Sequence, residues 1–217
     1  MKPIDTDGIS WIKPVPGGTA EWYFGIDYTH GDLYEAEELF RAGRPVLGRS
    51  FCLVRYPDGT VFRPLPEEPG TFCVEPVFLD GAIYLLRADF PKALLSILRF
   101  DCGSGAVSAV AELPLSAVRD CYNLKLHTAP LCLTRQGGEG VFEIVWPERV
   151  SFPLGARESF FLRDGDRLFF NRWNEEGENE SYRYWEQTLI RDLKGRLLET
   201  LPGDVERMPN GALWHLK

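Results

Sequence analysis

Residues 71–117 read TFCVEPVFLDGAIYLLRADFPKALLSILRFDCGSGAVSAVAELPLSA, and this stretch decides the fold class. Apolar runs alternate in it with turn sequences, and the runs cover residues 72–79, 82–88, 94–100 and 106–113. Asp80-Gly81 predicts a tight hairpin between the first two runs, because both central residues of a type I′ turn need positive φ. Consecutive short strands joined by tight turns form an antiparallel sheet, and about 45 residues is the length of one propeller blade. The stretch therefore predicts a four-stranded blade.

Turn signals of the same kind recur along the rest of the chain. Turns between a third and a fourth strand are expected near Gly59, Gly105, Glu148 and Gly195, at intervals of 46, 43 and 47 residues. A repeat of this length with four strands per unit is typical of propellers. We therefore predict an all-β, propeller-like ring of four-stranded antiparallel units, with five blades favoured and four possible. A single domain over residues 1–217 would form it, and a two-sheet sandwich or an irregular barrel is the structural alternative.

One segment has the periodicity of a helix. Leu33, Ala36, Leu39 and Phe40 recur at helical spacing. Asp32 can cap the amino end, and Gly43 can end the helix at the other side. We predict one short helix, inserted between two strands over about residues 32–43, with its glutamates Glu35, Glu37 and Glu38 facing outward.

Charge and composition limit the classes of partner. The chain has 24 Lys plus Arg against 32 Asp plus Glu, which leaves a net charge of −8. This excess disfavours phosphate backbones and anionic membrane surfaces, so we expect neither a nucleic-acid nor a membrane partner. The amino-terminal residues lack the apolar segment of a secretion signal, and no stretch approaches the roughly 20 apolar residues of a membrane span. A cytoplasmic location is expected.

The five cysteines are odd in number and widely spaced, without a C-x-x-C pair: Cys52, Cys73, Cys102, Cys121 and Cys132. This spacing predicts free thiols in a reducing compartment, with no disulfide and no zinc site. We expect neither a metal nor another cofactor.

Two clusters combine histidine with carboxylates. Asp27 and His30 lie close to Asp32 and could hold a metal or act as an acid/base pair, but they also fit a strand end and a turn before the helix. Asp120 and His127 flank Cys121, which suggests a thiol nucleophile or a turn between two blades. We favour the structural interpretation for both clusters and keep their residues as candidate ligand contacts.

A third cluster is aromatic and acidic, and it contains Trp173, Glu175, Tyr182, Tyr184 and Trp185. Aromatic faces beside carboxylates are suited to binding sugars or cationic groups. Cross-strand aromatic pairs also stabilise sheets, so packing is the simpler interpretation. Of the three clusters, this one is the best candidate for a ligand site.

No sequence motif for phosphate binding, dinucleotide binding, zinc proteolysis or a serine nucleophile is present. We favour a non-enzymatic domain for ligand binding, protein binding or scaffolding, which uses a propeller face for an unknown small molecule, sugar or protein. The alternative is a carbohydrate-active hydrolase with a carboxylate pair near the central channel, and a homo-oligomer joined through exposed aromatics is a third possibility. The carboxylates considered for the hydrolase, by position alone, are Glu21, Asp27, Glu75, Asp120, Glu158 and Asp164.

Three segments carry a resemblance to a known family. They are DYTHGDLYEAEEL at 27–39, RDCYNLKLHT at 119–128 and ESFFLRDGDRLFFNRW at 158–173. They resemble segments of a family of small, acidic, bacterial cytosolic proteins to which no activity is assigned. The resemblance implies a single domain and transfers no catalytic residue.

The last residues repeat the opening of a unit. Asn210-Gly211 stands where earlier units have Asp80-Gly81, and alternating residues 212–216 follow it. An isolated hairpin is marginally stable in water. We therefore predict that this hairpin closes the ring together with residues 9–15, and that Trp214 is buried.

Overall fold

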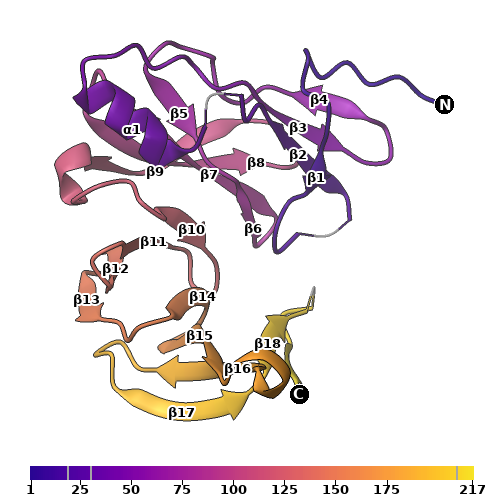
Figure 1. Ribbon diagram of the computed structural model, residues 1–217. Helices are drawn as coiled ribbons and strands as arrows, with labels where there is room; N and C mark the ends of the chain where they lie inside the picture. The colour runs from indigo at the N-terminus through magenta and orange to yellow at the C-terminus, as the bar shows by residue number, and fades with distance from the viewer. Residues whose placement is uncertain (19, 30, 209) are drawn as a thin grey trace. The chain divides into compact units, whose positions relative to one another are not determined.

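The computed structural model describes residues 1–18, 20–29, 31–208 and 210–217 (Figure 1). The chain forms two compact units, residues 1–126 and residues 127–217. Both units are built from antiparallel strands, and the first also holds the helix α1 (Leu33–Arg41). The single domain that we expect from the sequence stays a prediction.

The first unit contains two antiparallel sheets. One sheet has the order β1-β2-β3-β4, with β1 at Lys13–Pro14, β2 at Trp22–Ile26, β3 at Phe51–Arg55 and β4 at Thr60–Phe62. The other has the order β5-β7-β8-β9, with β6 also paired to β7. Its strands are β5 (Thr71–Cys73), β6 (Val77–Leu79), β7 (Ala82–Asp89), β8 (Leu94–Asp101) and β9 (Val107–Pro114), and the short 3-10 helix η1 (Leu115–Ala117) follows.

The second unit contains two four-stranded sheets and a hairpin, and the strand β10 of the first of these sheets begins two residues before the boundary between the units. The sheet β10-β11-β12-β13 has its strands at Lys125–His127, Cys132–Gly137, Val141–Trp146 and Val150–Pro153. The sheet β14-β15-β16-β17 has its strands at Glu158–Asp164, Arg167–Glu176, Arg183–Arg191 and Leu197–Pro202, with the 3-10 helix η2 (Asn179–Ser181) between β15 and β16. The hairpin pairs β18 (Asp204–Arg207) with β19 (Leu213–Leu216).

The predicted all-β, propeller-like fold class is confirmed. Within the described ranges, the strands form four blade-sized antiparallel sheets in chain order and one two-stranded sheet. The strand count therefore corresponds to the four-blade alternative, and the fifth blade that we favoured is represented by the hairpin alone.

One strand boundary differs from the predicted one. The run 72–79 is divided into β5 and β6, because Pro76 has no N–H to donate to a ladder. The strand β15 continues to Glu176, although residues 174–176 are polar. The predicted helix is confirmed at Leu33–Arg41.

The helix ends follow from side chains that the sequence singles out. The Asp32 side chain accepts from the Glu35 N–H, and the Glu35 side chain accepts from the Asp32 N–H. This capping box satisfies two donors that the helix leaves open. At the other end, Gly43 has φ +66° and the Arg44 N–H donates to the Leu39 carbonyl, which is a Schellman ending.

The outward orientation expected for Glu37 is wrong. Glu37 is buried, its carboxylate accepts from the Cys121 N–H at 2.6 Å, and it pairs with Arg41 at 2.7 Å. A buried carboxylate is stable where such partners satisfy it.

Each unit has its own hydrophobic core. In the first unit, the core contains buried residues from both sheets, among them Trp22, Phe24, Leu53, Ile83 and Leu85. In the second unit, Phe142 packs against Phe152, Phe160 and Phe170 with ring centroids 5.3, 4.6 and 5.2 Å apart. These residues alternate along their strands, so the sheets bury the apolar face that the sequence pattern predicts.

The predicted burial of Trp214 is wrong, because its side chain is 57% exposed. Trp214 pairs with Glu206, whereas His215 pairs with Val205. Neighbouring residues of a strand point to opposite faces, and Val205 is the buried residue, packed with Phe169 and Ile190. Trp214 therefore lies on the opposite face. Closure of a ring by the two ends of the chain stays a prediction.

Candidate functional site

Strands β15 and β16 extend beyond the other strands of their sheet. The pairing of β14 reaches Arg172, and the pairing of β17 reaches Gln187. Beyond these residues the register joins residues 173–176 to residues 183–186, and no other strand in the described part of the chain is paired with them. We call this two-stranded extension the ribbon.

The register sorts the predicted aromatic site onto two faces. Trp173 pairs with Glu186 and Glu175 pairs with Tyr184, so these side chains share one face of the ribbon. Trp185 pairs with Asn174 and lies on the opposite face. Trp173 and Trp185 are 38% and 39% exposed. The structure therefore brings Trp173, Glu175 and Tyr184 together and separates Trp185 from them.

The face of the ribbon that carries Trp173 and Glu175 binds an arginine from outside the ribbon. The Arg157 guanidinium carbon lies 4.3 Å from the centroid of the Trp173 ring. Its Nη2 donates to Glu175 Oε1 at 3.2 Å, and the Tyr182 hydroxyl donates to Glu175 Oε2 at 3.2 Å. This hydrogen bond to Glu175 raises the pKa of Tyr182. An aromatic face, a carboxylate and a phenol together form a site for a guanidinium or ammonium group.

Tyr184 belongs to a second acidic group on the same face. Its hydroxyl donates to Glu186, whose other oxygen accepts from Asn171 Nδ2 at 3.3 Å. The same nitrogen donates to Asp204 at 2.8 Å. The hydrogen bond from Tyr184 is the main cause that lowers the pKa of Glu186. A lowered pKa favours the ionised carboxylate, so Glu186 adds negative charge to this face.

Asp27 lies at the end of β2. Its carboxylate accepts from the Thr29 N–H at 2.9 Å and from the Thr29 hydroxyl, which is an Asx turn. Its carbonyl accepts from Arg49 Nε at 2.8 Å. His30, its predicted companion, lies outside the described residues.

The second predicted cluster is divided between the two units. Asp120 accepts from the Tyr122 N–H at 3.0 Å in the first unit. His127 begins the second unit, where its ring lies 4.7 Å from that of Phe160. Burial, followed by the charge of Glu37, raises the pKa of the Cys121 thiol. Nucleophilic cysteines have lowered pKa values, so Cys121 is not prepared for attack.

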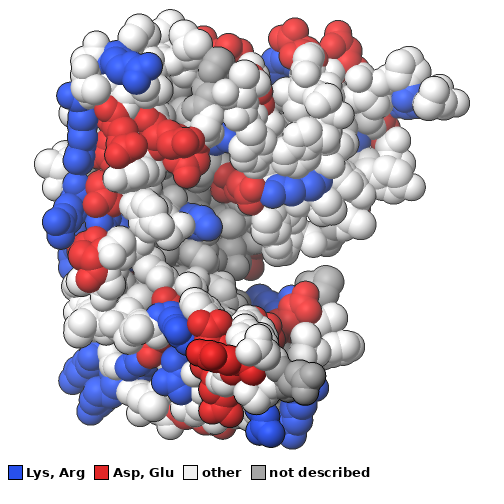
Figure 2. Space-filling view, in the orientation of Figure 1, with Lys and Arg blue, Asp and Glu red and all other residues white. Residues whose placement is uncertain are grey.

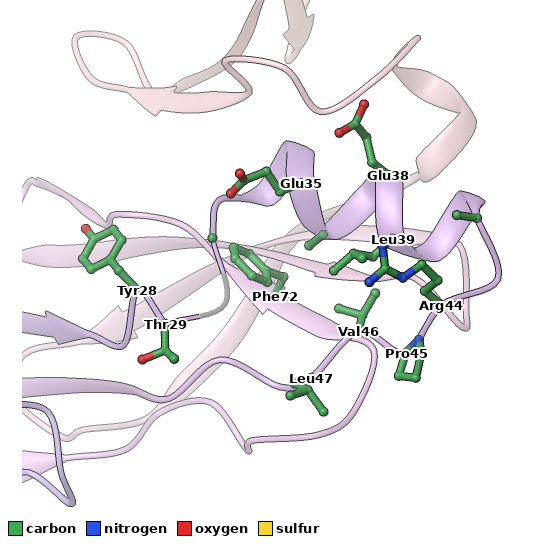
Figure 3. A pocket seen from close by; sticks show the side chains of 13 residues that line it. Tyr28, Thr29, Glu35, Glu38, Leu39, Arg44, Pro45, Val46, Leu47 and Phe72 are labelled. Carbon is green, nitrogen blue, oxygen red and sulfur yellow. The ribbon is translucent and has the colours of Figure 1, made fainter.

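Sequence reasoning missed Arg157 and a pocket in the first unit. Arg157 contacts Glu175, which is 18 residues away in the chain, and no motif marks this pairing. The pocket lies beside α1, has a volume of about 770 Å³, and is lined among others by Tyr28, Leu39, Arg44 and Phe72 (Figure 3). Capping residues marked the helix, but nothing in the sequence marked the hollow beside it.

All five cysteines are free thiols. In the part of the chain that the structure describes, no three His, Cys, Asp or Glu side chains are grouped so that they could hold a metal ion. The helices there are too short or too polar to cross a membrane.

No protein-family model matches the sequence, and no curated protein matches it either. The resemblance of residues 27–39, 119–128 and 158–173 to a bacterial family stays a prediction.

Proposed function

We propose that this protein is a non-enzymatic binding module, and that the Trp173 face of the ribbon recognises an arginine or lysine side chain of a protein partner. The observation that carries the proposal is the way in which Trp173, Glu175 and Tyr182 surround the Arg157 guanidinium. The propeller-like fold is compatible with such a role, since propellers commonly present binding surfaces.

The composition of the ribbon supports a role in binding. Its aromatic rings stand where the sheet has narrowed to two strands, and Tyr182 and Tyr184 are about half exposed. Exposed aromatic side chains contribute little to stability and are enriched in interfaces. Glu175, Glu176 and Glu178 give the end of the ribbon a negative charge that favours a basic partner.

The hydrolase alternative has no observation in its favour. Glu158 pairs with Arg191 at 3.0 Å and Asp164 pairs with Arg207 at 2.9 Å. Although burial opposes it, hydrogen bonds from Lys13 and Tyr28 lower the pKa of Glu75. A general acid of a glycosidase needs a raised carboxyl pKa, whereas the pKa of Glu75 is lowered.

We also propose a cytoplasmic location. Free thiols at all five cysteines support it, since exported proteins commonly oxidise such residues. Fractionation of the source cells with an antibody to the chain tests it, and recovery in a membrane or secreted fraction would contradict it.

A pair of peptides tests the proposed function. A hexapeptide of arginine and its citrulline counterpart differ in charge but hardly in shape. Titration followed by NMR of the indole N–H groups is expected to show binding of the arginine peptide at Trp173, with citrulline at least about fivefold weaker. Trp173→Ala should remove this difference. Equal binding of both peptides, or no binding of either, would refute the proposal.

The chain offers a matched control for this titration. Trp185 lies on the same ribbon with nearly the same exposure as Trp173, but on the opposite face. Trp185→Ala should leave the arginine peptide affinity unchanged. An equal loss in both variants would show that the ribbon needs its aromatics for its own structure, rather than for recognition by one face.

A further inference from the structure

We propose that the pocket beside α1 is a second, independent binding site, and that it takes a small organic carboxylate with a flat apolar body. We call it the helix pocket. Its volume of about 770 Å³ lies within the range of small-molecule sites. It belongs entirely to the first unit, whereas the ribbon belongs to the second, so this proposal does not depend on the proposed function.

The walls of the helix pocket suit a flat apolar group. The rings of Tyr28 and Phe72 line it, together with the aliphatic side chains of Leu39, Val46 and Leu47 (Figure 3). Phe72 and Val46 are buried, and Leu47 is exposed at the rim. Aromatic and aliphatic walls with few polar groups are typical of sites for small organic molecules.

Several side-chain contacts hold both rings in place. The Arg49 guanidinium carbon lies 4.4 Å from the Tyr28 ring centroid and 4.5 Å from that of Phe72. Arg49 is itself fixed, because Nε donates to the Asp27 carbonyl and Nη1 to the Cys73 carbonyl at 3.1 Å. Tyr28 also stacks on Trp11 at 5.3 Å and donates to Glu75 at 2.8 Å. The two rings are therefore already held in place without a ligand. Binding then costs less conformational entropy, which favours affinity.

The acidic groups of the pocket have other partners. Glu35 accepts from the Asp32 N–H at 2.8 Å, as part of the capping box. Glu38 accepts from the Tyr34 hydroxyl, and in Figure 3 its carboxylate points away from the hollow. Red atoms gather in Figure 2 where Figure 1 draws α1, so the visible surface of this helix is acidic.

Arg44 is the charged group of the pocket that remains for a ligand. Its backbone is fixed by the Schellman ending of α1, and its guanidinium has no acidic partner among the described residues. In Figure 3 its side chain extends from the loop toward Leu39 and Val46. Arg49 is not part of the pocket wall, but its buried Nη2, beside the two rings, has no hydrogen-bond partner in the described ranges. A planar guanidinium binds a carboxylate with two parallel hydrogen bonds.

Three probes with one indole body and different charges test the proposal on the full chain. They are indole-3-acetate, the neutral indole-3-acetamide and the cationic tryptamine. Calorimetric titration is expected to give saturable binding of indole-3-acetate, at least about fivefold tighter than the amide and tighter still than tryptamine. Preferred binding of tryptamine, equal binding of all three probes, or no saturable binding of any would overturn the proposal.

Arg44→Gln locates the binding and has a matched control. The variant should lower the affinity for indole-3-acetate to that for the amide, and its thermal unfolding should match wild type because Arg44 is exposed in a loop. Arg183→Gln removes an exposed arginine of the second unit and should change nothing. An unchanged affinity in Arg44→Gln, or an equal loss in Arg183→Gln, would contradict the assignment to the helix pocket.

Discussion

Glu37 shows how one residue can mislead an interpretation of charge. Leu33, Ala36, Glu37 and Phe40 follow the i, i+3, i+4, i+7 pattern of one helix face. Spacing therefore places Glu37 on the inner face, whereas composition suggests the outer one. The structure follows the spacing, because the Cys121 N–H and Arg41 supply the partners that a buried carboxylate needs. The sequence alone did not show the contact with Cys121, which is 84 residues away in the chain.

Removing this carboxylate should destabilise the first unit. Glu37→Ala leaves the buried Cys121 N–H without its acceptor, and we expect a loss of about 1–3 kcal/mol in unfolding free energy. Glu37→Gln keeps an acceptor oxygen and should cost less. Urea unfolding measures both variants. Glu38→Ala, at an exposed position of the same helix, is the control, and an equal loss there would contradict a special role for Glu37.

The thiols should react slowly, with Cys102 first. Burial raises the pKa of Cys102 to about 11 and that of Cys73 to about 12. At pH 8, a thiol with the pKa of Cys102 carries on the order of a hundredfold less thiolate than a free cysteine. Cys102 is half-buried and the other four are buried, so it is the most accessible. Its labelling rate should still rise between pH 8 and about pH 11.

Mass spectrometry after iodoacetamide treatment of the folded protein measures this order. Cys102→Ser should remove the first labelled site without changing the others. Rapid labelling of Cys121 at neutral pH would contradict the raised pKa and would revive the thiol-nucleophile hypothesis.

At the scale of elements, the last strands of two sheets each carry a bulge. In β9, Ala109 and Ala111 pair with consecutive residues of β8, which leaves Val110 without a partner. In β17, Leu197 and Glu199 pair with consecutive residues of β16, which leaves out Leu198. Both unpaired residues are exposed and apolar. Bulges interrupt the edge of a sheet and so discourage pairing with another chain.

Deleting Leu198 should make this edge regular and promote self-association. Leu197 and Glu199 would then be consecutive, and β17 would pair with β16 without interruption. We expect a folded variant that forms larger species at lower concentration than wild type, as measured by light scattering. Leu198→Lys keeps the bulge and adds a charge, so it should associate no more than wild type. Equal association of the deletion variant and wild type would show that the bulge has no protective role.

Local turn chemistry explains how much of the fold could be predicted. Asp80 and Gly81 have φ +48° and +75°, as the predicted type I′ turn requires, and the strands on both sides end where expected. Such signals lie within a few residues and need no tertiary information. The division of the aromatic site depends instead on the register of β15 and β16, and Arg157 enters from another strand connection. The composition of the sequence predicted the aromatic group, but the register of the two strands determines which of its side chains share a face.

At the scale of the whole molecule, the chain end is attached to the second unit through one face of its hairpin. Val205 packs with Phe169 and Ile190, and the Thr188 hydroxyl donates to the Gly203 carbonyl at 2.9 Å. Arg207 donates to Asp164 at 2.9 Å. These contacts give β18 and β19 the support that an isolated hairpin lacks. The opposite face carries Trp214, which contributes no buried surface comparable with that of Val205.

Two substitutions in this hairpin should therefore have opposite outcomes. Val205→Ala removes buried methyl groups beside Phe169 and Ile190, and we expect it to cost about 1–3 kcal/mol in chemical unfolding. Trp214→Ala removes a larger but exposed side chain, so its effect should stay within about 0.5 kcal/mol. Because surface area alone would rank the two in the reverse order, the comparison separates burial from size. A cost for Trp214→Ala equal to or above that of Val205→Ala would mean that the indole is buried in solution, as closure of a ring by the two chain ends requires.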